Sequence, residues 1–155
     1  MKEMEELVAE VPVLSGLAQA HLDLIAGCAQ NTRFDAGTYL FREGDPADRF
    51  YAVRQGAVAL EIHVPAREAV VVETLHTGDL LGWSWLFPPF RWSFDARALE
   101  PVGAIAFDGA CLRGKCETDP ELGYALMQRI AQVIIERLQA TRMRLLDVYG
   151  VEAAT

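Results

Sequence analysis

Between residues 32 and 107, short apolar runs alternate with turns that contain glycine, and this rhythm restricts the fold more than any other feature of the sequence. In one stretch, apolar residues at 58, 60, 62 and 64 alternate with Ala59, Glu61 and His63, which places His63 on the outer face of a strand. Further runs lie at 39–41, 50–53, 70–72, 79–81, 96–99 and 102–107. About eight short strands at intervals of roughly ten residues predict an all-β sandwich or barrel.

Helical periodicity appears on both sides of this region. Apolar residues recur at helical spacing over 14–28, which predicts a short amphipathic helix that starts near Ser15 and carries His21 as a packed or capping residue. Asp119 and Pro120 form a helix start, and no proline follows them, so a second helix is predicted over 120–149. At about 1.5 Å per residue this helix is roughly 45 Å long, which exceeds the width of a domain of this size.

The long helix carries an apolar stripe that predicts a partner. Its members follow one another in steps of three or four residues: Met127, Ile130, Ile134, Leu138, Thr141, Leu145 and Val148. Part of the helix is expected to pack on the β-structure while the remainder forms a homodimer. The expected dimer interface contains Ile130, Ile134, Leu138, Thr141 and Leu145. The alternative is a single helix that packs wholly on its own β-structure.

Length and composition fit one folded domain with an ordinary core. The chain has 155 residues, of which 52% are hydrophobic and 23% are charged. Its net charge of −8, from 14 basic and 22 acidic residues, repels a phosphate backbone, so no nucleic-acid binding is expected of this chain alone. No apolar run reaches the roughly 20 residues that cross a bilayer, and residues 1–10 lack the basic start and apolar middle that are typical of a signal peptide. A cytoplasmic protein without a membrane segment is therefore expected.

Residues with reactive or metal-binding side chains are sparse. Cys28, Cys111 and Cys116 do not form a disulfide framework, and the expectation is that they are small apolar packing residues rather than zinc ligands. The three histidines, at 21, 63 and 76, lack metal-ligand spacing, and no pairing of a nucleophile with a base is visible. We therefore expect no metal site and no enzyme.

Residues 82–94 break the strand rhythm, because they contain all three tryptophans of the chain and two adjacent prolines. A segment this apolar needs to be covered by protein or by a ligand. One helical turn after Gly82 would point free backbone N–H groups outward, and such groups attract an anion. An arginine would complete an anion site of this kind. Arg97 lies between two alanines and is favoured as an outward-facing strand residue, whereas Arg91 remains an open candidate.

Three stretches resemble the cyclic-nucleotide-binding domains of the Crp/Fnr type. Residues 41–53, Phe-Arg-Glu-Gly-Asp-Pro-Ala-Asp-Arg-Phe-Tyr-Ala-Val, with Gln55-Gly56, are similar to the opening of that domain. Residues 77–82, Thr-Gly-Asp-Leu-Leu-Gly, resemble the strand that enters its phosphate-binding cassette, and residues 137–141, Arg-Leu-Gln-Ala-Thr, resemble the part of its dimer helix that reaches the base. The resemblance covers about 11–149.

The resemblance implies a mainly β fold, an eight-stranded β-roll (jelly roll) with a short N-terminal helix and a long C-terminal dimer helix. It implies a single domain over 1–155, with the N-terminal helix at 11–30, the roll at 31–108 and the C-terminal helices at 109–150. It also implies a ligand site that contains Gly82, Trp83, Ser84, Arg91, Trp92, Ser93, Arg137 and Thr141.

Two departures bear on the ligand. In members that bind cyclic AMP, a glutamate follows the cassette glycine and accepts the ribose hydroxyl, and Trp83 has that place here. The cassette arginine that grips the phosphate falls on Ser93 or Trp92, depending on the direction of counting, and Arg91 lies next to that register. No cofactor is required, and the expected effector is one other than cyclic AMP, or cyclic AMP bound more weakly than in those relatives.

Crp/Fnr regulators continue after the dimer helix into a winged helix-turn-helix, whereas this chain ends at Thr155. Without a recognition helix, no sequence-specific DNA binding is expected. The leading hypothesis is a stand-alone sensor domain that binds a small-molecule effector and reports through its dimer interface. The alternatives are a protein-interaction or scaffold domain whose pocket is filled by its own tryptophans, and the effector half of a Crp/Fnr transcription regulator.

Overall fold

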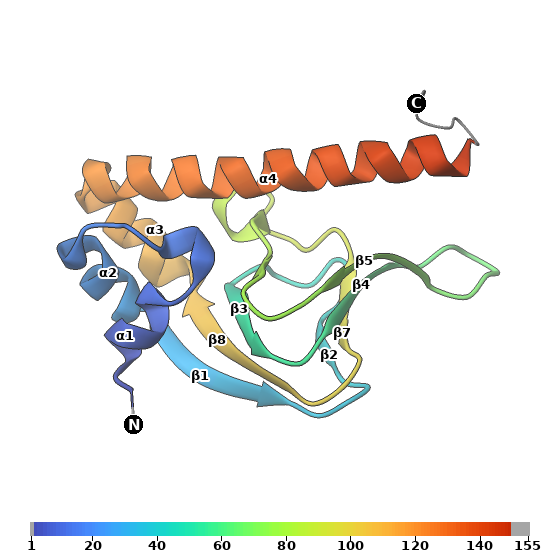
Figure 1. Cartoon of the computed structure of the whole chain (residues 1–155), viewed down its shortest axis with the longest axis horizontal. Helices are drawn as coiled ribbons and strands as arrows, with labels where there is room; N and C mark the ends of the chain where they lie inside the picture. The colour runs from blue at the N-terminus through green and yellow to red at the C-terminus, as the bar shows by residue number, and fades with distance from the viewer. Residues whose placement is uncertain (1, 150–155) are drawn as a thin grey trace, which may run out of the picture.

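The computed structural model describes residues 2–149 and contains two four-stranded antiparallel sheets (Figure 1). One sheet has the order β1-β8-β3-β6 and the other has the order β2-β7-β4-β5. The strands are β1 (Ala29–Phe34), β2 (Tyr39–Phe41), β3 (Arg49–Gln55), β4 (Val58–Ile62), β5 (Val70–Leu75), β6 (Leu80–Leu81), β7 (Asp95–Ala98) and β8 (Val102–Asp108). The all-β structure of about eight short strands predicted from the alternating runs is confirmed, and so is the eight-stranded roll that the family resemblance implies.

The apolar faces of both sheets meet in one core, and a register shift decides which side of β4 is buried. His63 is exposed as expected, but the pairing of β4 with β5 shifts between Leu60 and Glu61. Glu61 is therefore only 4% exposed, while Ile62 is 43% exposed. The simple alternation read from the sequence was wrong at these two positions, because the bulge interrupts it between Leu60 and Glu61.

Arg97 on β7 neutralises the buried negative charge of Glu61 on the neighbouring strand β4. Its Nε donates to Glu61 Oε1 at 2.8 Å and its Nη2 donates to Glu61 Oε2 at 3.1 Å, which is a two-point ion pair. The hydrogen bond with Glu61 and the charge of that carboxylate raise the pKa of Arg97. Arg97 is thus a strand residue, as expected, and it stabilises the sheet.

The N-terminal helices differ from the prediction of one helix over 14–28. The structure has α1 (Met4–Ala9), a 3₁₀ turn η1 (Pro12–Leu14) and α2 (Gln19–Ala26). Gly16 has a φ of +86°, which interrupts helical structure between η1 and α2, so the helix does not start near Ser15. Leu7, Val8, Leu22 and Ile25 are buried and join these helices to the core of the roll.

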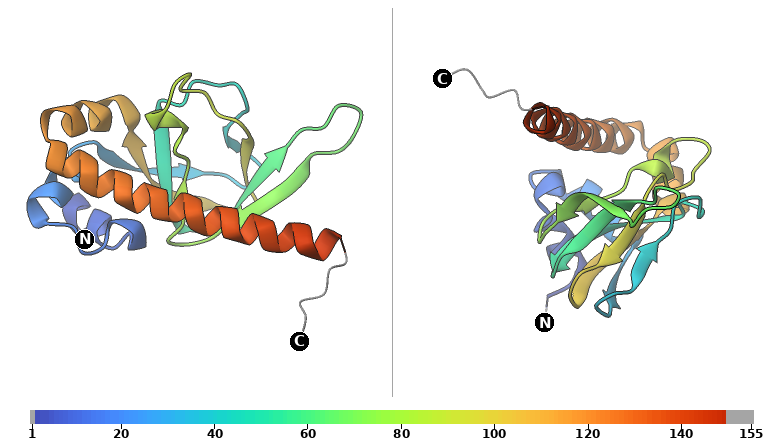
Figure 2. Two further views of the ribbon diagram at one scale, coloured as in Figure 1. Left: turned by 90° about the horizontal axis from the view of Figure 1, so that it is seen from above. Right: turned by 90° about the vertical axis from the view of Figure 1, so that its right-hand side faces the viewer.

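Two helices follow the roll: α3 (Gly109–Thr118) and α4 (Pro120–Val148). The Asp119 side chain accepts a hydrogen bond from the Leu122 N–H at 3.2 Å, and Pro120 lies in the first turn, so α4 begins where the sequence predicted. α4 crosses above the roll and continues past it toward the protruding β4–β5 hairpin (Figures 1 and 2). No helix within residues 2–149 is long and apolar enough to cross a membrane.

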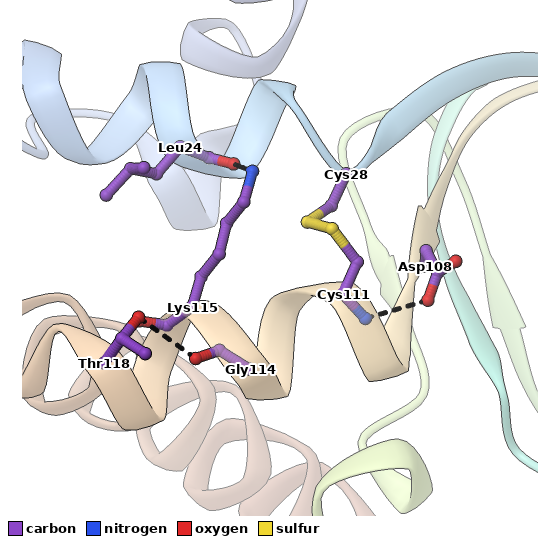
Figure 3. The surroundings of a disulfide bond; sticks show 7 residues. All are labelled: Leu24, Cys28, Asp108, Cys111, Gly114, Lys115 and Thr118. Carbon is purple, nitrogen blue, oxygen red and sulfur yellow. Dashed lines mark hydrogen bonds between the residues drawn. A yellow bond between two sulfur atoms is a disulfide. The ribbon is translucent and has the colours of Figure 1, made fainter.

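The prediction that all three cysteines are apolar packing residues was wrong for Cys28 and Cys111. Cys28 and Cys111, 83 residues apart, form a disulfide with a Cα–Cα distance of 5.8 Å (Figure 3). Spacing along the chain gave no hint of this pair, because the end of α2 and the start of α3 meet only in the folded molecule. Cys116 is a free, half-buried thiol, and burial raises its pKa, with Asp119 and Glu117 adding to the effect.

Candidate functional site

The segment from Gly82 to Phe94 follows β6 and forms the candidate site, which we call the cassette. Gly82 has a φ of +97°, a conformation that favours glycine. A Cβ at this position would lie 2.3 Å from two ring carbons of Trp92. The glycine is therefore required twice, for the turn and for the close approach of the indole.

Trp92 occupies the interior of the roll beside Gly82. Its side chain is 4% exposed and stacks on Phe41, with ring centroids 3.7 Å apart and planes 7° from parallel. The ring of Phe94 lies 6.3 Å away. Each such aromatic contact adds about 0.5–1.5 kcal/mol beyond burial of area. The indole is thus a core side chain held in place by neighbours from β2 and from the cassette itself.

The backbone on either side of Trp92 fixes which side chains face inward. Trp92 N–H donates to Asp45 O at 3.0 Å and Gly44 N–H donates to Trp92 O at 2.8 Å. Arg91 and Ser93 are both exposed, and Arg91 Nη1 donates to Gly44 O at 2.7 Å. The open candidate Arg91 is therefore bound to a surface turn and is not brought to Gly82.

The helical turn expected after Gly82 is the 3₁₀ turn η2 (Ser84–Leu86). Ser84 is half-buried, and Trp85 is fully buried and stacks on Phe50 at 4.4 Å between centroids. Arg113 of α3 donates through Nη1 to Trp85 O, and its guanidinium lies 4.6 Å from the ring centroid of Phe90. No local pattern pointed to Arg113, because this residue lies in α3 and the segment that it contacts follows β6.

Arg137 joins α4 to the entrance of the cassette. Its Nη2 donates to Leu80 O, its Nε lies 3.9 Å from Glu73 Oε1, and its guanidinium lies 5.0 Å from the ring centroid of Trp83. Burial lowers the pKa of this guanidinium, and Glu73 and Asp79 oppose that effect. Arginine stays protonated in proteins, so this is a buried positive charge that is held by a carbonyl, a carboxylate and an aromatic face.

The predicted ligand set is only partly brought together. Gly82, Trp83, Trp92 and Arg137 converge at or beside the cassette. Thr141 is exposed on α4, where its Oγ1 donates to Arg137 O at 2.9 Å. Glu73 and Phe41, which the sequence did not suggest, contact Arg137 and Trp92, and only their positions on neighbouring strands reveal it.

A hollow of about 440 Å³ lies outside the cassette, between α4, η1 and the turn before β6. Its lining includes Pro12, Leu75, Gly78, Arg129, Glu136 and Arg137, and it contains none of Gly82, Trp83 or Trp92. Two buried side-chain nitrogens of the described residues lack an acceptor, Trp85 Nε1 and Arg137 Nη1. No group of three metal-binding side chains is present in residues 2–149.

Comparison with known proteins shows the family to which this chain belongs. The family model for the cyclic nucleotide-binding domain matches residues 31–119, which is more than half of the chain. The chain therefore belongs to the cyclic nucleotide-binding domain family, and the resemblance inferred from its sequence is confirmed.

Individual relatives place the chain near the sensor domains of Crp-type regulators. It is 24% identical over 145 residues to a CRP-like cAMP-activated global transcriptional regulator of Mycobacterium tuberculosis, covering 94% of this chain and 63% of the relative. A Geobacter metallireducens GS-15 protein, whose crystal structure bears the name of a cyclic nucleotide-binding protein, is 28% identical with a TM-score of 0.77, and 89% of this chain and 99% of that chain align. The N-terminal domain of a Streptomyces coelicolor A3(2) transcriptional regulator is 25% identical with a TM-score of 0.69, covering 86% and 94% of the two chains.

Proposed function

We propose that this chain is a non-catalytic, cytoplasmic regulatory domain whose cassette has lost high affinity for cyclic AMP and responds to a different small effector. The observation that carries this proposal is the place of Trp92. A side chain that is 4% exposed, stacked on Phe41 and pressed against Gly82 fills the space beside the cassette glycine. A sugar phosphate would have to displace it.

The groups that this chain lacks, relative to members that bind cyclic AMP, set the size of the expected loss in affinity. A carboxylate that accepts a ribose hydroxyl makes a charge-assisted hydrogen bond worth about 1.5–3 kcal/mol. Trp83 is donor only through its indole and is unable to accept that bond. With Arg91 held on the outer surface by Gly44 O, a cyclic phosphate at Gly82 would also lack its paired guanidinium. A combined loss of roughly 3 kcal/mol or more corresponds to over a hundredfold in affinity.

Arg137 supports a sensing role, because it connects the cassette to α4. Its Nη1 is buried without an acceptor, and an unsatisfied buried donor costs about 1–3 kcal/mol. An effector that supplies an acceptor to Arg137 would relieve this cost and would change how α4 is held against Trp83 and Leu80. The binding site would thus act directly on the helix that we propose as the dimer interface.

We propose that α4 carries the signal through a homodimer. In its second half, apolar side chains are exposed at a coiled-coil spacing, with Leu138 at 48%, Leu145 at 51% and Val148 at 79%. An apolar stripe of this length on a soluble helix indicates a partner surface. The partner that this repeat fits is a second copy of the same helix.

Calorimetry tests the proposed ligand preference. We expect cyclic AMP and cyclic GMP to bind wild-type protein with dissociation constants above about 100 µM. The double variant Trp83→Glu/Trp92→Arg restores a carboxylate and a guanidinium, and it should bind cyclic AMP at least about tenfold more tightly. Arg91→Gln is the matched control and should change nothing. A wild-type dissociation constant at or below about 1 µM would contradict the proposal.

A second function, a protein-interaction or scaffold domain, is favoured by the same filled interior. If Trp92 is a permanent core residue, no effector is needed and the fold only presents its surfaces. Native mass spectrometry of protein purified from cells distinguishes the two functions, because a sensor carries a small molecule of defined mass and a scaffold carries none. The chain spans 63% of the length of its mycobacterial relative, so an effector half of a longer regulator is a third proposal.

A further inference from the structure

α3 is the junction between three parts of the molecule. It follows β8 directly and leads into α4 with only Asp119 between them. One face of α3, which carries Cys111 and Lys115, points toward α2 (Figure 3). Lys115 Nζ donates to Leu24 O at 2.7 Å, and Cys111 is bonded to Cys28. Two ties therefore join α3 to the end of α2, one covalent and one a hydrogen bond.

Other residues of α3 hold the cassette. Arg113, two residues after Cys111, donates to Trp85 O and lies over the ring of Phe90. Gly109, two residues before Cys111, lies so close to Trp85 that a Cβ there would be 3.1 Å from the tryptophan Cβ. The first turns of α3 thus connect the disulfide to η2 and the cassette within five residues of chain.

The disulfide borders the surface. A hollow of about 250 Å³ is lined by both cysteines together with Gln30, Arg49 and Asp108. Cys28 is 7% exposed and Cys111 is half-buried, so Cys111 Sγ belongs to the more accessible residue of the pair. The Asp108 side chain accepts from Cys111 N–H at 2.9 Å and caps α3, and this contact does not depend on the state of the sulfur.

We propose that Cys28 and Cys111 form a reversible thiol–disulfide site, through which a dithiol reductant changes the attachment of α3 and thereby the packing of the cassette. A reductant thiolate attacks Cys111 Sγ, the S–S bond breaks, and Cys28 leaves as a thiolate that takes up a proton. The second thiol of the reductant attacks the mixed disulfide and releases Cys111, and the reductant departs as its own disulfide. Two electrons pass from the reductant to the protein.

Reduction breaks the covalent link between α3 and the end of α2, and the hydrogen bond from Lys115 Nζ to Leu24 O remains. α3 then gains freedom at the turn from which Arg113 reaches Trp85 O. In a thiol-rich compartment, disulfides are uncommon and those that form serve mainly as transient or sensing bonds. The site would therefore report redox state to the same cassette that we propose as the effector site, by a route that does not require the effector.

The protein contains its own reporter for this proposal, because all three tryptophans, Trp83, Trp85 and Trp92, lie in the cassette. In the air-oxidised 155-residue chain, alkylation should modify one cysteine, and after dithiothreitol it should modify three, as measured by intact mass. Reduction should lower the melting temperature by about 5–15 °C, since a cross-link is lost. It should also change tryptophan emission, and reoxidation should restore the original spectrum.

Three variants separate a signalling bond from a purely structural one. Cys28→Ser/Cys111→Ser should give the reduced spectrum with no response to dithiothreitol, and reduced, alkylated wild-type protein gives the same comparison if that variant does not fold. Cys116→Ser should respond as wild type does. Arg113→Gln should keep the change in melting temperature but lose the change in emission. The proposal is overturned if Cys28 and Cys111 are free thiols in the oxidised protein. It is also overturned if reduction lowers the melting temperature but leaves tryptophan emission unchanged, or if Arg113→Gln keeps the wild-type emission response.

Discussion

The two halves of α4 have the same apolar periodicity but opposite surroundings. In the first half, Leu122, Leu126 and Ile130 are at most 3% exposed and belong to the core, and α3 and η1 pack against this part of α4. In the second half, Leu138 and Leu145 are about half exposed. Ile130, which the sequence assigned to the dimer stripe, is therefore a core residue of its own chain. A periodic apolar stripe shows that a helix face will be covered, but it does not show by what.

The largest difference between the halves should appear in the free energy of unfolding. Leu126→Ala removes a fully packed side chain and should lower the free energy of unfolding by about 2–5 kcal/mol at any protein concentration. Leu138→Ala should lower it only at concentrations where a dimer forms. Urea denaturation at two protein concentrations measures both effects. Equal, concentration-independent losses in the two variants would show that the halves do not differ.

Charge in the second half should break the proposed dimer without unfolding the chain. Leu138→Glu/Leu145→Glu would bury carboxylates between two helices and should weaken dimerisation over about a hundredfold. Both positions avoid Ile134, which packs partly on the core. Sedimentation of wild type and variant, with circular dichroism as a check on folding, measures the change. Wild-type protein that sediments as a monomer would exclude the dimer outright.

Arg137 lies between the two halves and should have an intermediate effect. Arg137→Gln removes the contacts to Leu80 O, Glu73 and Trp83, and we expect a loss of about 1–3 kcal/mol in stability together with altered tryptophan emission. Arg142→Gln, on the exposed part of α4, is the matched control and should change stability by less than about 0.5 kcal/mol. Similar values for both variants would mean that Arg137 does not couple α4 to the cassette.

The smallest expected loss in stability concerns the beginning of α4. Asp119→Ala removes the side chain that accepts from Leu122 N–H, and a lost helix cap typically costs about 1 kcal/mol. Asp119→Asn retains a capping oxygen and should recover most of this loss. Thermal unfolding followed by circular dichroism measures the difference. An alanine variant as stable as the asparagine variant would mean that packing of Leu122 and Leu126 alone fixes the beginning of α4.

In the cassette, some features can be predicted from the local sequence and others cannot. The position of Gly82 and the departure at Trp83 could be recognised locally, but the facing of residues 91–93 could not. Counting along the chain left Arg91, Trp92 and Ser93 as neighbours of uncertain register. Backbone hydrogen bonds to Gly44, Asp45 and Ala47 choose the register, which points Trp92 inward and Arg91 outward. Those partners lie more than 40 residues away, so no local pattern carries the choice.

Local signals predict an all-β structure of about eight strands and the long final helix, because strand alternation, glycine turns, a capping Asp119 and the absence of later prolines can be read from short stretches of sequence. The roll itself is implied by the family resemblance. Only the folded molecule reveals the Cys28–Cys111 bond, the inward place of Trp92, the ion pair of Arg97 with Glu61 and the burial of Ile130. Each of these depends on a contact between segments far apart in the chain. Periodicity fixes which faces are apolar, but only the packing of one element on another fixes which residues meet.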